Sequence, residues 1–128
     1  MSVTALPSFD HTFTVNIEGT DTKQNFTGTF TYRRPNLRAK SEIAKMTARL
    51  NEDLKNLDED VAFLHNVLAT LRYSLSPHDN AGWWKNSDYG YNLFDVNVVI
   101  DIYKECRKFE DEWFNKVWGE TPKEAEKK

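Results

Sequence analysis

The chain has 128 residues, a mass of 15.0 kDa, a formal net charge of −3 and 29% charged residues. This length fits one domain with its own core, and the mixture of acidic and basic residues leaves no sustained basic face for nucleic acid. No apolar run approaches the roughly 20 residues of a membrane span, and residues 1–7 lack the basic and apolar regions of a secretory signal. The single cysteine, Cys106, excludes an internal disulfide. We therefore expect a soluble protein of a reducing cytoplasm, or of a particle assembled there.

Residues 9–17 and 26–32 alternate between large side chains and small polar ones. One face of the first segment carries Phe9, His11, Phe13, Val15 and Ile17, and one face of the second carries Phe26, Gly28, Phe30 and Tyr32. This alternation predicts two half-buried strands, and the polar, glycine-containing link over 18–25 predicts an antiparallel hairpin. A hairpin alone is marginal in water, so its apolar face must pack on other elements. Its exposed edges also invite strand pairing with another chain, a first indication of self-association or partner binding.

Three amphipathic segments follow and predict helices. The first begins at Asn36 or soon after, because Pro35 ends the preceding strand. Its apolar stripe is Ile43, Met46, Leu50, Leu54 and Leu57. Asp58 is a plausible N-cap for the second helix, whose stripe is Val61, Leu64, Leu68, Leu71 and Leu75, with Pro77 helping to stop it.

Asp95 can cap the third helix, and Gly119 fits its C-terminal stop. The buried side of this helix is expected to carry Val96, Val99, Ile100, Tyr103, Phe109, Trp113 and Val117. Together the elements predict one α+β domain over residues 1–118, mostly α, with an N-terminal antiparallel β-hairpin packed on about three helices. Residues 119–128 form a charged tail that we expect to be flexible.

The segment over 76–94 combines turn residues with an unusual concentration of aromatic rings. The rings are Trp83, Trp84, Tyr89, Tyr91 and Phe94. One interpretation is a lid that folds its rings over the helical core. The other is a docking surface, because Trp and Tyr dominate the energetics of protein interfaces. On the second interpretation, Trp84→Ala weakens partner binding more than it lowers stability.

Residues further along the chain could enlarge such a surface. Trp113 and Phe114 are adjacent and cannot both point into one narrow helical stripe. Arg33 and Arg34 form a tight basic pair that either meets an acidic partner or is simply a solvated corner. The candidate partner-binding residues are therefore Trp83, Trp84, Tyr89, Tyr91, Trp113, Trp118, Arg33 and Arg34.

Catalytic chemistry has little support. His11, His65 and His78 lie far apart without the spacing of metal ligands, so we expect no metal and no cofactor. Cys106 lies three residues after Tyr103 and three before Phe109, which places it on the core side of the third helix rather than at an active site. The sequence contains no phosphate-binding loop, dinucleotide fingerprint or Ser-His-Asp order. We therefore expect a protein that is not an enzyme.

The layout over residues 9–118 resembles the tail assembly chaperones of tailed bacteriophages. The pieces that carry the resemblance are the aromatic-Gly-aromatic strand Phe26 to Tyr32, the corner Arg33-Arg34-Pro35, the helix opening Ser41-Glu42-Ile43-Ala44, the Leu-rich helix Leu64 to Leu75, Pro77 with Trp83-Trp84, and the aromatic helix Phe109 to Trp118. The resemblance implies a non-enzymatic protein that associates with the tape measure protein, helps to recruit tail tube subunits and self-associates. Such a protein works in the host cell cytoplasm and leaves the finished particle.

Two other functions compete with this hypothesis. A permanent virion component, such as a head, neck or tail accessory protein, would be found stoichiometrically in purified particles. An enzyme or small-molecule binding protein would use the aromatic segment as a pocket, but no set of residues in the chain suggests a ligand.

Overall fold

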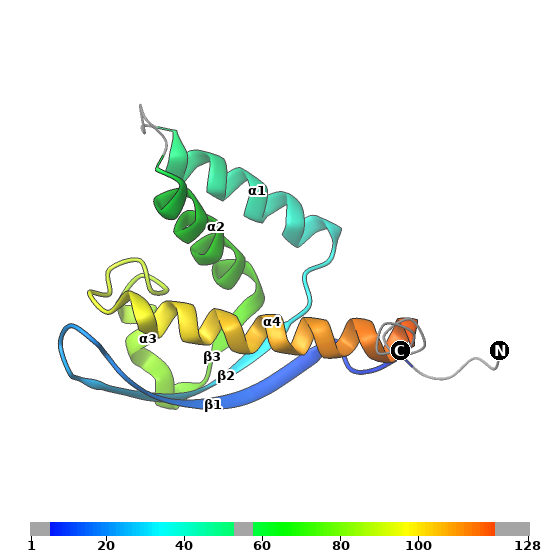
Figure 1. Ribbon diagram of the computed structural model, residues 1–128, viewed down its shortest axis with the longest axis horizontal. Coiled ribbons are helices and arrows are strands. Elements are labelled where there is room, and N and C mark those ends of the chain that lie inside the picture. The colour runs from blue at the N-terminus through cyan, green and yellow to red at the C-terminus, as the bar shows by residue number, and fades with distance from the viewer. Residues whose placement is uncertain (1–5, 53–57, 120–128) are drawn as a thin grey trace, which may run out of the picture.

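The computed structural model describes residues 6–52 and 58–119. Its elements in chain order are β1 (Asp10–Glu18), β2 (Asn25–Arg33), α1 (Leu37–Asn51), α2 (Glu59–Ser74), β3 (Leu75–Pro77), the 3₁₀ turn η1 (Asp79–Ala81), α3 (Gly82–Asn86) and α4 (Val96–Trp118). The predicted class, a mostly helical α+β fold with an N-terminal hairpin, is confirmed. Helix α4 runs along the sheet, and the α1–α2 pair projects away from it (Figure 1). Leu54, Leu57 and residues 120–128 lie outside the described residues.

The sheet has the order β1-β2-β3 and is antiparallel throughout. The short strand β3 was not predicted, because Leu75 reads as the end of the second helical stripe. In the structure α2 ends at Ser74, and Leu75 pairs with Tyr32 of β2. Pro77 disfavours helix at the residue before it and lacks a donor, and an edge strand tolerates both properties. The chain therefore leaves the helix before Pro77 and continues as the third strand of the sheet.

The core lies between the inner face of the sheet and helices α2, α3 and α4. Phe30, Leu71, Trp84 and Ile102 are all fully buried there. The turn η1 approaches the central strand so closely that a Cβ on Gly28 would lie 2.5 Å from the Cβ of Ala81. Only glycine fits this position of β2 without displacing the turn.

Two aspartates predicted as helix caps behave differently. Asp58 caps α2 as expected, since its Oδ1 accepts hydrogen bonds from the amides of Asp60 and Val61. Asp95 stands at the N-cap position of α4 but makes no capping bond, so that part of the prediction is wrong. Its carboxylate accepts hydrogen bonds from the amides of Asp21 and Thr22 and from the Thr22 hydroxyl. The hydrogen bond from the Thr22 hydroxyl lowers the pKa of Asp95. The three hydrogen bonds to Asp95 join the β1–β2 loop to the start of α4.

Candidate protein-docking surface

Trp83 and Trp84 belong to the core and its margin. Trp84 is 0% exposed and meets Phe30 edge-on, with ring centroids 5.7 Å apart. Trp83 is partly buried against Phe26 and donates from its indole Nε1 to the carbonyl of Thr27 at 2.8 Å. The expectation of a surface position for Trp84 is therefore wrong. The short helix α3 turns both rings toward β2. They therefore pack into the core, as in the lid interpretation, but against the sheet, whereas that interpretation placed them over the helices.

Tyr89 and Tyr91 lie in the turn that follows α3. Asp88, Tyr89 and Gly90 all have positive φ, and a Cβ on Gly90 would lie 2.7 Å from the Trp84 ring. The guanidinium of Arg72 covers the partly buried ring of Tyr89, 4.2 Å from its centroid. Tyr91, in contrast, is 49% exposed. Of the two tyrosines, Tyr91 has the more accessible ring.

The end of α4 separates its aromatic residues in the same way. Trp113 is buried beneath the guanidinium of Arg34, which lies 3.8 Å from the ring centroid, and its Nε1 donates to the carbonyl of Pro7. Trp118 is 66% exposed and lies beside the exposed ring of Phe114. Trp113 therefore serves packing, and Trp118 remains available for a partner.

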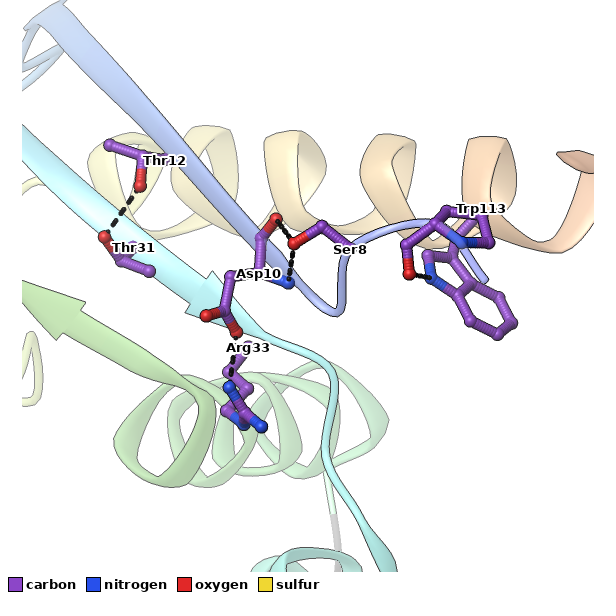
Figure 2. Close-up of polar contacts among 7 residues, drawn as sticks. Ser8, Asp10, Thr12, Thr31, Arg33 and Trp113 are labelled. Atoms are coloured by element: carbon purple, nitrogen blue, oxygen red, sulfur yellow. Dashed lines mark hydrogen bonds and ion pairs between the residues drawn. The ribbon is translucent and has the colours of Figure 1, made fainter. Parts of the chain in front are cut away.

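The two arginines of the basic corner also differ. Arg33 is exposed and pairs with Asp10 at 2.8 Å, across the first rung of the β1–β2 ladder (Figure 2). Arg34 is partly buried and donates from Nε to Glu110 at 2.7 Å. Arg34 is thus engaged inside the fold, which leaves Arg33 as the solvated member of the pair.

An apolar groove of about 180 Å³ lies between α2, α4 and the turn before α4. It is lined by Val61, Leu64, His65, Leu68, Gly90, Tyr91, Leu93, Val96 and Val99. None of these lining residues carries a carboxylate, an ammonium or a guanidinium group. Phe94, which follows Leu93, is 80% exposed, and Val96 is 47% exposed. Exposed apolar area around an apolar groove is typical of a protein-binding surface.

Sequence reasoning identified only part of this groove. It named Tyr91 but assigned the α2 residues entirely to the core and did not single out Phe94 as an exposed ring. The available signal was the position of Val61 and Leu64 at the start of the α2 stripe, ahead of Val67, the first fully buried residue of the helix. Nothing local in the sequence shows that the packing of α2 on α4 opens toward the start of α2.

A second, polar cleft of about 320 Å³ lies between α1, α2 and α4. Its floor holds Tyr32, whose hydroxyl donates to Glu110 at 2.6 Å, and Cys106, which is 1% exposed. Burial raises the pKa of Tyr32 well above its ordinary value, and the hydrogen bond to Glu110 adds to the shift. Burial likewise raises the pKa of Cys106, with Glu105 and Glu110 contributing. The predicted core position of Cys106 is confirmed, and its thiol stays protonated at neutral pH.

These two shifts predict a loss of stability in alkali. The unfolded chain ionises Tyr32 and Cys106 near their ordinary pKa values of 10.0 and 9.0, whereas the folded protein keeps both protons. The two groups therefore make their full contribution to the free energy of unfolding below about pH 9. As the pH rises further, the free energy of unfolding falls by up to about 1.4 kcal/mol per pH unit for each group. Urea denaturation between pH 8 and 11 measures this slope. Tyr32→Phe should flatten it above pH 10 and the exposed control Tyr91→Phe should not; parallel slopes for all three proteins would contradict the assignment.

The three histidines lie apart. His11 bonds to Glu105 and stacks on Phe109, His65 bonds to Asn51, and His78 bonds to Thr31. Among residues 6–52 and 58–119, no cluster of His, Cys, Asp or Glu could hold a metal ion. Within the same ranges no helix is both long and apolar enough to cross a membrane. Comparisons with models of protein families, with curated proteins and with solved structures gave no match.

Proposed function

We propose that this chain is a non-enzymatic morphogenesis protein of a tailed bacteriophage, a tail assembly chaperone that binds the tape measure and tail tube proteins in the host cytoplasm. The phage partners come from the resemblance of the sequence. The observation that supports a binding role is the uncharged apolar groove between α2 and α4, with Tyr91 and Phe94 exposed beside it. A groove of this kind suits the apolar face of a helical segment, which inserts side chains at positions i, i+3 and i+4.

If the groove binds the partner, substitutions beside it should weaken partner binding much more than a substitution of an equally exposed residue elsewhere. We expect the double variant Tyr91→Ser, Phe94→Ser to weaken capture of the tape measure protein at least about tenfold, as loss of interface aromatics does. Leu37→Ser is the matched control, because Leu37 is also 80% exposed but lies at the start of α1. Pull-down of the co-expressed tape measure protein, followed by titration of the purified pair, measures the effect. Equal binding by all three proteins would move the docking surface elsewhere, and no binding by the unmodified chain would contradict the proposed partner.

The proposed role also predicts where the chain is found. A transient chaperone is present in the lysate of infected cells and absent from purified virions. Quantitative mass spectrometry of both fractions tests this. Stoichiometric presence in virions would support the alternative, a permanent head, neck or tail component.

A further inference from the structure

In the part of the chain that the structure describes, the backbone of β1 is hydrogen-bonded to β2 on one side and is largely open on the other. The carbonyl of Phe9 accepts from the amide of Arg34, and the amide of Gly19 donates to the carbonyl of Gln24. Both pairs continue the β1–β2 register, so odd-numbered residues of β1 form the hydrogen-bonded pairs with β2. Because bonded and non-bonded pairs alternate, the amides and carbonyls of the even-numbered residues point away from β2, toward the edge of the sheet.

Side chains of the same chain cap both ends of this edge. At one end the hydroxyl of Ser8 bonds the amide and the carbonyl of Asp10, at 3.0 and 3.1 Å (Figure 2). At the other end Asn97 of α4 donates to the carbonyl of Glu18 at 3.0 Å. Between these caps, the amides and carbonyls of Thr12, Thr14 and Asn16 have no hydrogen-bond partner among the described residues.

The uncapped middle of β1 also lacks the features that normally prevent strands from pairing. Residues 11–17 contain no Lys, Arg, Asp, Glu or Pro, and the ladder to β2 runs without a bulge. The opposite edge of the sheet is β3, which has three residues and includes Pro77. Within residues 6–52 and 58–119, the sheet therefore has one blunted edge and one edge open to another strand.

We propose that β1 pairs antiparallel with β1 of a second copy of this chain, about a two-fold axis at Phe13. In this register Thr12 lies opposite Thr14 of the second copy, and Asp10 lies opposite Asn16. A register centred on Thr14 would instead place Asp10 opposite Glu18, where like charges repel. The proposal goes beyond the proposed function and does not depend on it, because its test uses the protein alone.

The outer face of the sheet indicates why the occupant is a second copy. Thr12 bonds to Thr31 at 2.9 Å and Thr14 bonds to Thr29 at 3.2 Å, hydroxyl to hydroxyl. Each hydroxyl donates one hydrogen bond and accepts two, so Thr12 and Thr14 retain capacity toward the open edge. A strand that pairs with β1 can extend these two hydroxyl pairs into longer rows of hydrogen-bonded hydroxyls if it presents hydroxyls at two alternate positions. The strand β1 itself does so, with Thr12 and Thr14. The dimer joins each Thr31–Thr12 row to a Thr14–Thr29 row of the second copy.

Helix α4 packs on the inner face of the sheet, where Glu105 contacts His11 of β1 and Glu110 contacts Tyr32 of β2. The side chains of Thr12 and Thr14 lie on the opposite face and are exposed, so α4 does not cover the threonine rows that the dimer would join. Because Pro77 blunts the far edges, association stops at a closed dimer.

The first test uses the unmodified full chain. Light scattering and sedimentation equilibrium over a concentration series should show a monomer–dimer equilibrium. Amide hydrogen exchange by NMR should show protection of Thr12 and Thr14 that rises with dimer fraction, while Phe13 and Val15, which bond to β2, are protected throughout. A monomer at every concentration would overturn the proposal, as would a dimer in which these two amides exchange freely.

Variants then test the edge and its register. Thr12→Lys, Thr14→Lys places lysine opposite lysine across the two-fold axis and should raise the dimer dissociation constant at least tenfold. Thr27→Lys, Ser76→Lys adds the same charge to the same exposed face on β2 and β3, and should leave dimerisation nearly unchanged. Mixing Thr12→Cys and Thr14→Cys proteins should give a mixed disulfide in excess over either homodimer, since these positions face each other. Equal effects of the two lysine pairs, or no preference for the mixed disulfide, would overturn the proposed register. None of these outcomes bears on capture of the tape measure protein, so the two proposals fail separately.

Discussion

Replacing Trp84 with alanine is expected to lower the free energy of unfolding by about 3–5 kcal/mol, the range for deleting a large buried aromatic side chain. Trp84 is 0% exposed and contacts rings on two sides, since Phe30 and Trp83 both meet it edge-on. The backbone of Gly90 also lies against the indole, which limits how far the turn can move to fill the space. Urea denaturation at neutral pH measures the loss.

Two controls separate packing from partner binding. Trp84→Phe keeps part of the ring volume and should cost clearly less than Trp84→Ala. Tyr91→Ala removes an exposed ring from the neighbouring turn and should change stability by less than about 1 kcal/mol. This pattern reverses the prediction from the sequence, in which Trp84→Ala impairs binding more than stability. A stable Trp84→Ala protein that fails to bind a partner would restore the earlier interpretation.

The sequence predicts well those elements whose pattern is local. The alternation around Phe13 and Phe30 predicts both strands to within a residue or two of β1 and β2. Asp58 marks the start of α2, and Gly119 follows the last residue of α4 with φ 82°. In each case the deciding physics lies within a few residues of the signal: period-two burial, an N-cap hydrogen bond and a positive φ.

Features that depend on distant contacts could not be predicted in this way. Leu75 fits the apolar stripe of α2, and only the presence of β2 beside it makes the extended conformation favourable. Asp95 has the composition of an N-cap, yet its partners are Asp21 and Thr22, more than seventy positions away along the chain. In the sequence Arg34 has the features of a surface residue, but in the structure it pairs with Glu110 and covers the ring of Trp113, both on α4.

The aromatic segment shows why composition alone could not assign its rings. Trp83 and Trp84 occupy one turn of α3, and both reach Phe30, at 5.9 and 5.7 Å between ring centroids. Tyr91 follows the positive-φ turn and therefore points to a different side of the molecule, beside the groove. The lid and docking interpretations thus describe different parts of one segment, with the core residues first and the exposed ring after the turn.

Glu110→Ala is expected to lower the free energy of unfolding by about 2–3 kcal/mol. Glu110 accepts from the Tyr32 hydroxyl at 2.6 Å and from Arg34 Nε at 2.7 Å, so it links β2, the basic corner and α4. Tyr32 is only 3% exposed, and leaving its hydroxyl without an acceptor costs about 1–3 kcal/mol. The Arg34 side chain is 29% exposed, so its share of the ion pair adds at most about 1 kcal/mol after solvent screening.

The neighbouring residue supplies the matched control for this prediction. Asp111 also carries a carboxylate on α4, but it is exposed and pairs with Arg107 at 3.6 Å one turn away. Asp111→Ala should therefore change stability by less than about 0.5 kcal/mol. A double-mutant cycle with Tyr32→Phe isolates the buried hydrogen bond, because the cost of Glu110→Ala should shrink once no hydroxyl needs an acceptor. If Glu110→Ala costs as little as Asp111→Ala, the buried junction between β2 and α4 is stabilised by apolar packing alone.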